Sequence, residues 1–338
     1  MKIAIVTINQ PSLDSATNLF RYLKDDYEVV VYGKKDLKHT LDNLHIYNKL
    51  DDILPSAWVS YDAIICILAM GAVVRKIAPL LVDKATDPAV LVINLALDKV
   101  VPLLSGHLGG ANELADDLTS LLPNCINFIS TATDQTNTLA FEMEAKRNGW
   151  EIANLKKLAN ISNRLLNKLP VKVATLQNVF DKLSKKENLE LIEFDSTDEN
   201  SVVISPNIQS KNLTLKPKVF LGIGCNRGTT CSEIENSVKI FLEKNNLKIE
   251  QIKNIASFEA KSDEVGILEF AKKYNFDIQF YEKESINGLE TEFSPSASTK
   301  FFGLKGVAEP SAILCSVYKE LIIRKEVYNK KITIAGAI

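Results

Sequence analysis

The fold is predicted most directly by residues 62–81, DAIICILAMGAVVRKIAPLL, and by residues 100–115, VVPLLSGHLGGANELA. The first stretch opens with a run from Asp62 to Leu68 that is almost wholly apolar, as in a parallel sheet covered on both faces. The pattern of Ala72 to Leu81 is then that of a helix. In the second stretch a short strand leads through a glycine-rich turn into another helix. Alternating strands and helices predict an α/β fold built in layers.

Outward from these stretches the alternation continues towards both ends of the chain. In the first part we expect strands at 2–7, 28–32, 62–68, 89–94, 100–103 and 127–130, and helices at 14–24, 72–81 and 111–121. A second alternation begins at Val219, with strands at 219–224, 252–258, 277–281 and 331–335 and helices at 232–245, 263–274 and 307–318. The capping pair Thr230 and Glu233 marks the start of the first of these helices.

The region between the two alternations is less regular and is rich in Lys, Asn, Glu and Ser. It holds expected helices at 141–148 and 155–169, short strand candidates at 189–194 and 202–204, and a linker near 216–218. We therefore predict an α/β protein with two three-layer α/β/α domains, residues 1–134 and 218–338. A small, variable middle region, residues 135–217, joins them.

The composition limits the classes of protein to which this chain can belong. A chain of 338 residues suggests two or three domains, and 46% hydrophobic with 24% charged residues is typical of a globular protein. The net charge of -2 argues against a general binder of nucleic acid or of a membrane surface. No apolar run reaches about 18 residues, and the first residues lack a signal-peptide pattern. The five cysteines contain no Cys-x-x-Cys pair, so we expect a cytoplasmic protein with reduced thiols.

The first candidate site is the run Ser105-Gly106-His107-Leu108-Gly109-Gly110, which follows a strand and opens a helix. Glycines let the backbone approach a ligand closely, and a helix start offers free N–H groups to an anion. His107 titrates near neutral pH, which makes it the candidate general acid or base. A glycine turn whose histidine makes only a structural hydrogen bond explains the same spacing equally well.

A second candidate is Arg75, four residues after Gly71 at another strand-to-helix junction. It could hold a carboxylate through two hydrogen bonds, although a helix arginine in an ordinary salt bridge is the simpler interpretation. Asp83 and Asp87 follow in a loop. Either aspartate could orient a water or His107, and either could equally serve the turn.

The third candidate is the run from Gly222 to Thr230, GIGCNRGTT, which again links a strand to a helix. It is neither a P-loop nor a dinucleotide fingerprint, because no Gly-Lys-Ser/Thr follows and the last glycine gap is one residue too long. Its backbone N–H groups, Arg227 and two hydroxyls would still suit an anion. The glycines could also serve only a tight turn.

Two further helix entrances carry polar residues, 258–264 and 306–310, and a solvated cap is the default interpretation of both. Among the cysteines, Cys66 and Cys315 are expected in the core. Cys225 has the best claim to reactivity, because it lies beside a helix start and Arg227.

Together these runs resemble the CbiG family of cobalamin biosynthesis proteins. Residues 71–80, 83–90 and 101–115 closely resemble the family's amino-terminal domain. Residues 222–229, 261–264 and 307–309 resemble its carboxy-terminal domain, which also occurs as a stand-alone protein in the oxygen-dependent pathway. The chain departs from the family at Asn226, where a second basic residue is more usual. The middle region carries almost no signature.

The resemblance implies cobalt-precorrin-5A hydrolase activity in the oxygen-independent route to vitamin B12. In that reaction a δ-lactone on the macrocycle opens, and a methylated carbon leaves as acetaldehyde. The cobalt belongs to the substrate, so neither a protein metal site nor a cofactor is expected.

Weighing this chemistry against the residues, we take His107 as the acid/base, supported by Asp87 or Glu113, with the N–H groups of Gly109 and Gly110 at the oxyanion. The candidates for binding the substrate's carboxylates and ring are Arg75, Lys76, Ser105, Gly106, Gly109, Gly110, Gly224, Arg227, Gly228, Thr229 and Lys261. This choice places the substrate between the domains. The resemblance does not itself fix these roles.

Two other functions remain open. One is a corrinoid carrier without catalysis, which acetaldehyde release would exclude. The other is an unrelated enzyme that binds a nucleotide on residues 222–230, which a nucleotide-dependent rise in thermal stability would favour. A small corrinoid is the expected partner, neighbouring pathway enzymes are candidate partners, and the sequence leaves the oligomeric state open.

Overall fold

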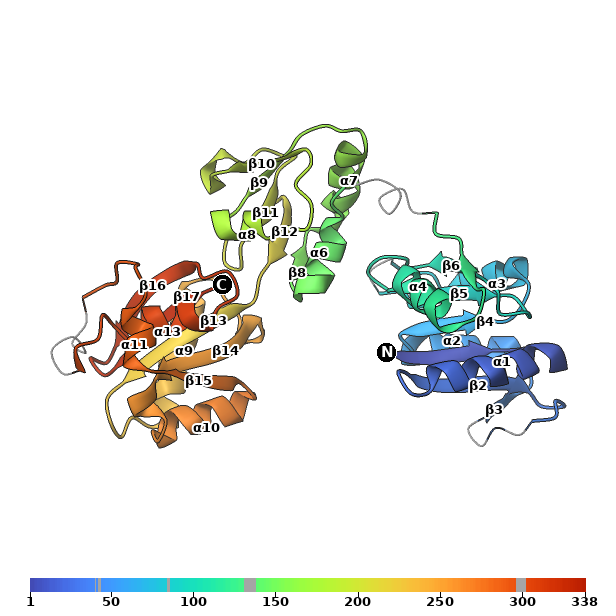
Figure 1. Cartoon of the computed structure of the whole chain (residues 1–338), viewed down its shortest axis with the longest axis horizontal. Helices are drawn as coiled ribbons and strands as arrows, with labels where there is room; N and C mark the ends of the chain where they lie inside the picture. The colour runs from blue at the N-terminus through green and yellow to red at the C-terminus, as the bar shows by residue number, and fades with distance from the viewer. Residues whose placement is uncertain (40, 42–43, 84–85, 131–137, 296–301) are drawn as a thin grey trace. The chain divides into compact units, whose positions relative to one another are not determined.

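The computed structural model describes residues 1–39, 41, 44–83, 86–130, 138–295 and 302–338 (Figure 1). Contacts between residues divide the chain into two units, Met1–Thr136 and Asn137–Ile338. Within the described ranges, no helix has the length and apolar character needed to cross a membrane.

The first unit is built around a seven-stranded sheet of order β3-β2-β1-β4-β5-β6-β7. Its strands are β1 (Lys2–Val6), β2 (Glu28–Lys34), β3 (Leu44–Tyr47), β4 (Ala63–Cys66), β5 (Ala89–Ile93), β6 (Lys99–Leu104) and β7 (Ile126–Asn127). Its helices are α1 (Gln10–Leu23), α2 (Leu50–Ser60), α3 (Met70–Ile77) and α4 (Ala111–Leu121), with a 3-10 turn, η1, at Ala78–Leu80.

Two hydrophobic clusters cover the two faces of this sheet. Ile3 and Ile5 of β1 pack with α1 and α4 on one face, while the alternate residues Ala4 and Val6 pack with α2 and α3 on the other. This period of two follows from the pleat of a strand. The unit is therefore a three-layer α/β/α domain, as the sequence predicts.

One strand reverses direction, and this decides where the first candidate site lies. β1 to β5 are parallel, whereas β6 is antiparallel to β5, so that Leu104 at the end of β6 faces Val90 near the start of β5. We call the edge where β1, β4 and β5 begin the amino edge, and the edge where they end the carboxyl edge. The loop after β6 leaves the sheet at the amino edge.

The middle region is more ordered than its composition suggests. It forms a five-stranded sheet of order β10-β9-β11-β12-β8. The strands are β8 (Glu151–Ala153), β9 (Val171–Ala174), β10 (Leu189–Ile192), β11 (Val202–Ile204) and β12 (Leu213–Lys216), and the helices are α6 (Phe141–Asn148), α7 (Leu158–Leu166) and α8 (Gln177–Asp181). Only Pro217 and Lys218 separate β12 from the next strand, and one hydrophobic cluster runs from this region into the following sheet. In place of a linker, the two sheets share a core.

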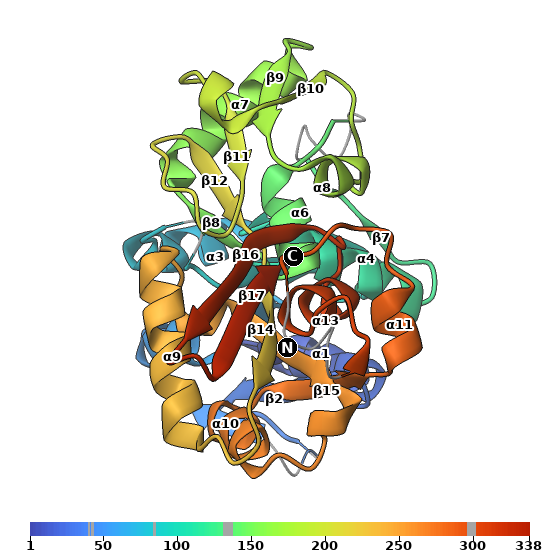
Figure 2. The same ribbon diagram turned by 90° about the vertical axis from the view of Figure 1, so that its left-hand side faces the viewer.

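The last sheet has the order β15-β14-β13-β17-β16. Its strands are β13 (Val219–Cys225), β14 (Ile252–Phe258), β15 (Asp277–Tyr281), β16 (Leu321–Tyr328) and β17 (Ile332–Ala337), and its helices are α9 (Cys231–Lys244), α10 (Val265–Tyr274), α11 (Lys283–Asn287) and α13 (Ala308–Cys315). α9 and α10 pack on one face, and α13 on the other, which again gives three layers (Figure 2). β17 lies between β13 and β16 and is antiparallel to both.

Candidate functional site

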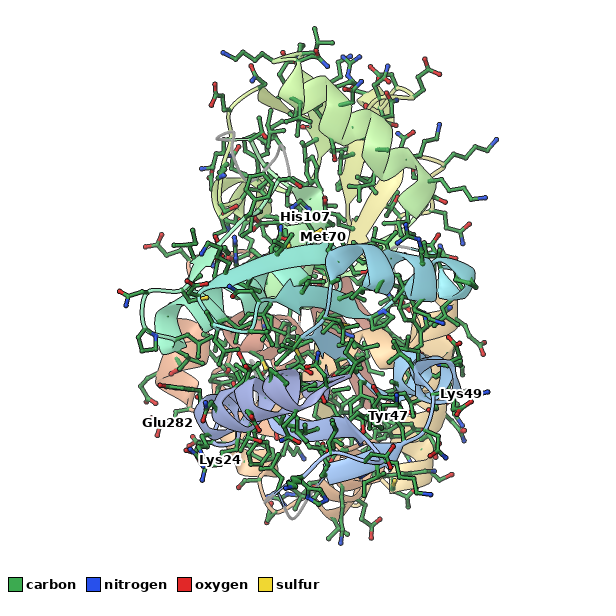
Figure 3. The ribbon with its side chains drawn as sticks, turned by 90° about the vertical axis from the view of Figure 1, so that its right-hand side faces the viewer. Lys24, Tyr47, Lys49, Met70, His107 and Glu282 are labelled. Carbon is green, nitrogen blue, oxygen red and sulfur yellow. The ribbon has the colours of Figure 1, made fainter. Side chains whose placement is uncertain are left out.

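The loop that carries His107 has a shape fixed by its own residues. Ser105 has a positive φ of 56°, and its Oγ donates to the carbonyl oxygen of Asp87 at 2.9 Å. A Cβ on Gly109 would lie 2.4 Å from the Cβ of Ser105, so this position accepts only glycine. Gly110, with φ of 87°, turns the chain into α4. We call residues 105–110 the histidine loop (His107 is labelled in Figure 3).

Much of the expected anion cradle is occupied by the loop itself. The N–H of Gly110 donates to the carbonyl of His107 at 3.0 Å, and the N–H groups of Ala111 and Asn112 donate to Ser105 and Gly106 at 3.1 and 3.0 Å. These bonds cap the start of α4, so the three N–H groups already donate to carbonyl oxygens of the loop. They correct the prediction that Gly110 supplies an oxyanion donor. The role of Gly109 stays a prediction.

Asp87 is buried, and its two carboxylate oxygens both accept from the N–H of Val82 at 3.1 Å. Its own N–H donates to the carbonyl of Asp83 at 2.9 Å. These bonds make Asp87 the residue that holds the turn before β5. Its catalytic role stays a prediction. Glu113 is exposed in the first turn of α4, directly after the histidine loop.

Arg75 and Lys76 do not join the histidine loop. α3 begins beyond the carboxyl edge, and the Arg75 guanidinium folds back to donate to Gly71 in its first turn at 2.8 Å. Lys76 pairs with Asp51 of α2 at 2.7 Å. The labels of Met70 and His107 fall close together in Figure 3, although the strand pairing puts these residues beyond opposite edges of the sheet.

In the second unit, two loops dock against each other although their contacting residues Gly228 and Glu264 are 36 positions apart in sequence. β13 and β14 are parallel neighbours, so the segments that follow them meet at one end of the sheet. The N–H of Gly228 donates to Glu264 Oε1 at 2.6 Å. A Cβ on Gly266 would lie 2.0 Å from the carbonyl oxygen of Thr229, so only glycine allows this approach. We call segments 226–230 and 259–264 the paired loops.

The paired loops gather two cations around one buried carboxylate. Arg227 pairs with Asp263, donates to the carbonyl of Ala260 at 2.9 Å and lies 3.7 Å from Glu264 Oε2. Lys261 also lies 3.7 Å from that oxygen. The predicted residues Arg227, Gly228, Thr229 and Lys261 are thus brought together here. Glu264 was missed, because an acidic residue at a helix entrance has the pattern of a solvated cap, and only the strand pairing buries it.

The first two glycines of the third motif serve packing. A Cβ on Gly222 would lie 1.8 Å from the carbonyl oxygen of Ala308 in α13, and one on Gly224 would lie 2.6 Å from Thr333 Oγ1. The strand therefore uses glycine so that the helix can approach its backbone. The role of Gly224 in binding the substrate stays a prediction.

Cys225 is not set up as a nucleophile. Burial raises the pKa of its thiol, and the nearby Lys261 opposes this shift without reversing it. A protonated thiol is a weak nucleophile. Burial also raises the pKa of Cys66 to about 12, in keeping with its expected place in the core.

Glu309, at the helix entrance 306–310, is buried instead of solvated. Its carboxylate accepts hydrogen bonds from Ser294 N–H at 2.7 Å, Ser294 Oγ at 2.8 Å and Lys325 N–H at 2.9 Å. Although burial opposes it, these bonds hold the pKa of Glu309 below its ordinary value. The residue fastens the start of α13 to β16 and to the segment near Ser294.

Comparison with known proteins now places the chain. Family models described as the cobalamin synthesis G N-terminal, the cobalamin biosynthesis central region and the cobalamin synthesis G C-terminus match residues 52–134, 139–219 and 219–337. The cobalt-precorrin-5A hydrolase of Priestia megaterium is 30% identical over 98% of this chain and 94% of its own. That of Salmonella typhimurium is 29% identical over 77% of this chain and 78% of its own.

A solved structure of a cobalamin biosynthesis protein G homologue from Sulfolobus solfataricus is 25% identical, covering 99% of this chain and 96% of its own with a TM-score of 0.42. The three family models follow one another along the chain, and the Priestia megaterium relative matches nearly all of it. The chain belongs to the CbiG family of cobalamin biosynthesis proteins.

Proposed function

We propose that this chain is a cobalt-precorrin-5A hydrolase, which opens the δ-lactone of its corrinoid substrate and releases acetaldehyde. The observation that carries the proposal is the nearly full-length similarity to the Priestia megaterium enzyme of that name. The Salmonella typhimurium relative of that name is 29% identical, and a Methanocaldococcus jannaschii relative named probable cobalt-precorrin-5A hydrolase is 28% identical.

The chemistry has two steps that a histidine can serve. Water adds to the lactone carbonyl, the ring oxygen leaves, and a carboxylate and a hydroxyl result. A base then takes the hydroxyl proton, the carbon that bears it becomes the aldehyde, and the electron pair of the broken C–C bond passes to the conjugated macrocycle. His107 would remove the proton from water in the first step and from the hydroxyl in the second.

The histidine loop supports this assignment by its rigidity. Ser105 holds one end of the loop to Asp87, and the N–H of Gly110 closes on the carbonyl of His107. A general base has to be held within hydrogen-bond reach of the proton it takes, and a loop fixed at both ends does this without a further ordering step. Glu113, one turn into α4, is the remaining candidate to orient the imidazole.

Exposed arginines are the candidates to hold the substrate's carboxylates, because the guanidinium geometry matches a carboxylate. Arg227 of the paired loops and Arg75 of α3 are both exposed, and Arg75 lies beyond the opposite edge of its sheet from His107. Lys76 has the weaker claim, because Asp51 already pairs with it. Cobalt would enter with the substrate as part of it.

The test is an anaerobic incubation of the full chain with cobalt-precorrin-5A, with acetaldehyde and the corrinoid mass as readouts. We expect acetaldehyde and a matching two-carbon loss. His107→Ala should lower turnover by about 10²–10⁴-fold. His39→Ala, which removes an exposed histidine of the same unit, should leave it unchanged.

Three outcomes would separate the alternatives. Bound corrinoid with no acetaldehyde would make the chain a carrier. Full turnover in the His107→Ala variant would remove His107 from the mechanism but leave the activity. If Glu113→Gln retains the wild-type pH profile, Glu113 does not orient the histidine.

A further inference from the structure

Two consecutive apolar residues are exposed at the amino edge of the first sheet. Leu81 and Val82 directly follow η1, and they are 48% and 83% exposed. A lone apolar residue at a protein surface needs no explanation, whereas adjoining ones form a patch that something can cover. We call Leu81 and Val82 the apolar pair.

The apolar pair is fastened to the histidine loop through one residue. The backbone N–H of Val82 donates to both carboxylate oxygens of the buried Asp87 at 3.1 Å. The carbonyl oxygen of Asp87 accepts from Ser105 Oγ at 2.9 Å, two residues before His107. Asp87 therefore holds the backbone of the pair and the start of the loop together, while the Val82 side chain remains exposed.

This anchoring is costly for a segment that adds little to the core. A buried carboxylate loses its hydration, and hydrogen bonds from the backbone replace only part of it. The fold thus buries a charged group to fix the backbone of two side chains that stay in water. Their position therefore matters for a contact outside the protein.

The chemistry proposed for the loop indicates which contact this is. If His107 acts on a lactone at the rim of a macrocycle, a face of that ring has to lie over the surface beside the loop. The ring faces of a corrinoid are largely apolar, and ligand sites are lined mainly by apolar side chains around a few polar groups. An apolar surface beside the base also keeps water away from the reacting carbon.

We propose that the apolar pair binds a face of the substrate's macrocycle while His107 acts at its rim. This inference rests on the proposed function for the identity of the ligand as a corrinoid. It adds an apolar contact to a site whose other candidate residues are polar or glycine.

The test replaces each residue of the pair by serine and measures steady-state acetaldehyde release by the full chain. We expect Val82→Ser and Leu81→Ser to raise KM about five- to twentyfold, the loss expected for one or two methyl groups that leave an apolar contact. The value of kcat should stay within about twofold, because a contact made equally before and during the reaction affects binding alone.

Two exposed apolar residues of the same unit serve as matched controls. Ile46, which is 56% exposed, lies on β3 at the far edge of the sheet from β6, and Leu95, 52% exposed, lies in the turn between β5 and β6. Ile46→Ser and Leu95→Ser should leave KM unchanged. All four variants should keep the wild-type melting temperature. If Val82→Ser does not, Val82→Thr keeps the branched shape, and we expect it to raise KM about threefold.

Three results would overturn the proposal. The first is a wild-type KM in both Val82→Ser and Leu81→Ser. The second is an equal rise in KM from Ile46→Ser or Leu95→Ser, which would make the effect general to the surface. The third is a wild-type dimer that Val82→Ser dissociates without a change in KM, because a second copy of the chain would then cover the pair.

Cobyrinic acid, a stable corrinoid with carboxylate side chains, separates this proposal from the hydrolase. Its affinity for the full chain is measured by calorimetry. If Val82→Ser weakens it about five- to twentyfold and Ile46→Ser does not, while the chain releases no acetaldehyde, the apolar contact stands and the hydrolase fails. Acetaldehyde release with a wild-type KM in both variants of the pair leaves the hydrolase and removes the contact. A wild-type chain that neither binds cobyrinic acid nor releases acetaldehyde refutes both.

Discussion

The close approach of α13 to β13 predicts a severe effect for a single added methyl group. In Gly222→Ala the new Cβ would lie 1.8 Å from the carbonyl oxygen of Ala308 and 2.7 Å from the N–H nitrogen of Ala312. Ordinary contact begins near 3.4 Å, so the helix would have to retreat by about 1.6 Å. The clashing atoms are backbone, which no side-chain rotation can move.

The size of the effect follows from two terms. Overpacking a well-filled core costs about 1–3 kcal/mol. The retreat of α13 would also loosen its cluster with Ala335 and Ala337, which adds to that loss. We expect the free energy of unfolding of the second unit to fall by about 3 kcal/mol or more. Gly228→Ala is the comparison: its φ is 72° with nothing within 4 Å of the new Cβ, so only backbone strain of about 1–2 kcal/mol applies.

The measurement is native-state hydrogen exchange in peptides from β13 and α13, because a chain with several sheets does not unfold in one step. If the Gly222→Ala variant does not accumulate as folded protein, Gly224→Ala gives a test with a smaller steric overlap. Its Cβ would meet Thr333 Oγ1 at 2.6 Å, and Thr333→Ala should restore part of the loss. Equal protection in Gly222→Ala and Gly228→Ala would refute the packing role and return the glycine to the candidate ligand cradle.

Three further predictions follow from polar groups. Glu309→Gln should lower the stability of the second unit by about 2–3 kcal/mol, since an amide cannot accept all the bonds that reach the carboxylate, and faster exchange in β16 would show it. Hydrogen bonds from the backbone of Thr230 and from Lys331 lower the pKa of Glu233 to about 2, so its stabilisation is present above pH 4.5 and is lost as the pH falls towards 2. The difference in melting temperature between wild type and Glu233→Gln should therefore shrink over that range, and a constant difference would contradict the shift. Asp87→Asn should lower stability by about 1–2 kcal/mol and keep turnover within about tenfold, because Asp87 holds a turn; a hundredfold loss of turnover would restore its catalytic role.

The parts of the fold that the sequence predicts well are those with a strong hydrophobic period. The strand at 62–68 and the helix at 111–121 reappear as β4 and α4, and α6 has the predicted bounds. β3, α2 and β16 were not expected. In β16 apolar and polar residues do not alternate clearly, because Arg324, Lys325 and Glu326 follow one another. Its place beside β17 is set by tertiary pairing.

The candidate site also has a part that the sequence predicts and a part that only the fold reveals. The sequence finds residues whose chemistry is local, such as His107 in its glycine loop and Arg227 beside Gly228. It cannot show that Arg75 and His107 lie beyond opposite edges, because that depends on the reversed direction of β6. Nor can it distinguish a cap from a buried anchor: Glu264 and Glu309 stand at helix entrances, and only strand neighbours decide that both are buried.

The position of β17 also bears on how the second unit forms. β13 to β16 are all synthesised before β17, yet β17 is the strand that joins β13 to β16. Until it arrives, β13 presents an unpaired edge whose N–H and C=O groups are free to pair with another chain. A nascent chain is thus in danger of aggregation through β13 until the residues of β17 have left the ribosome. Ribosomes stalled just before β17 should expose this edge, and the partly built sheet should be a preferred site for chaperones.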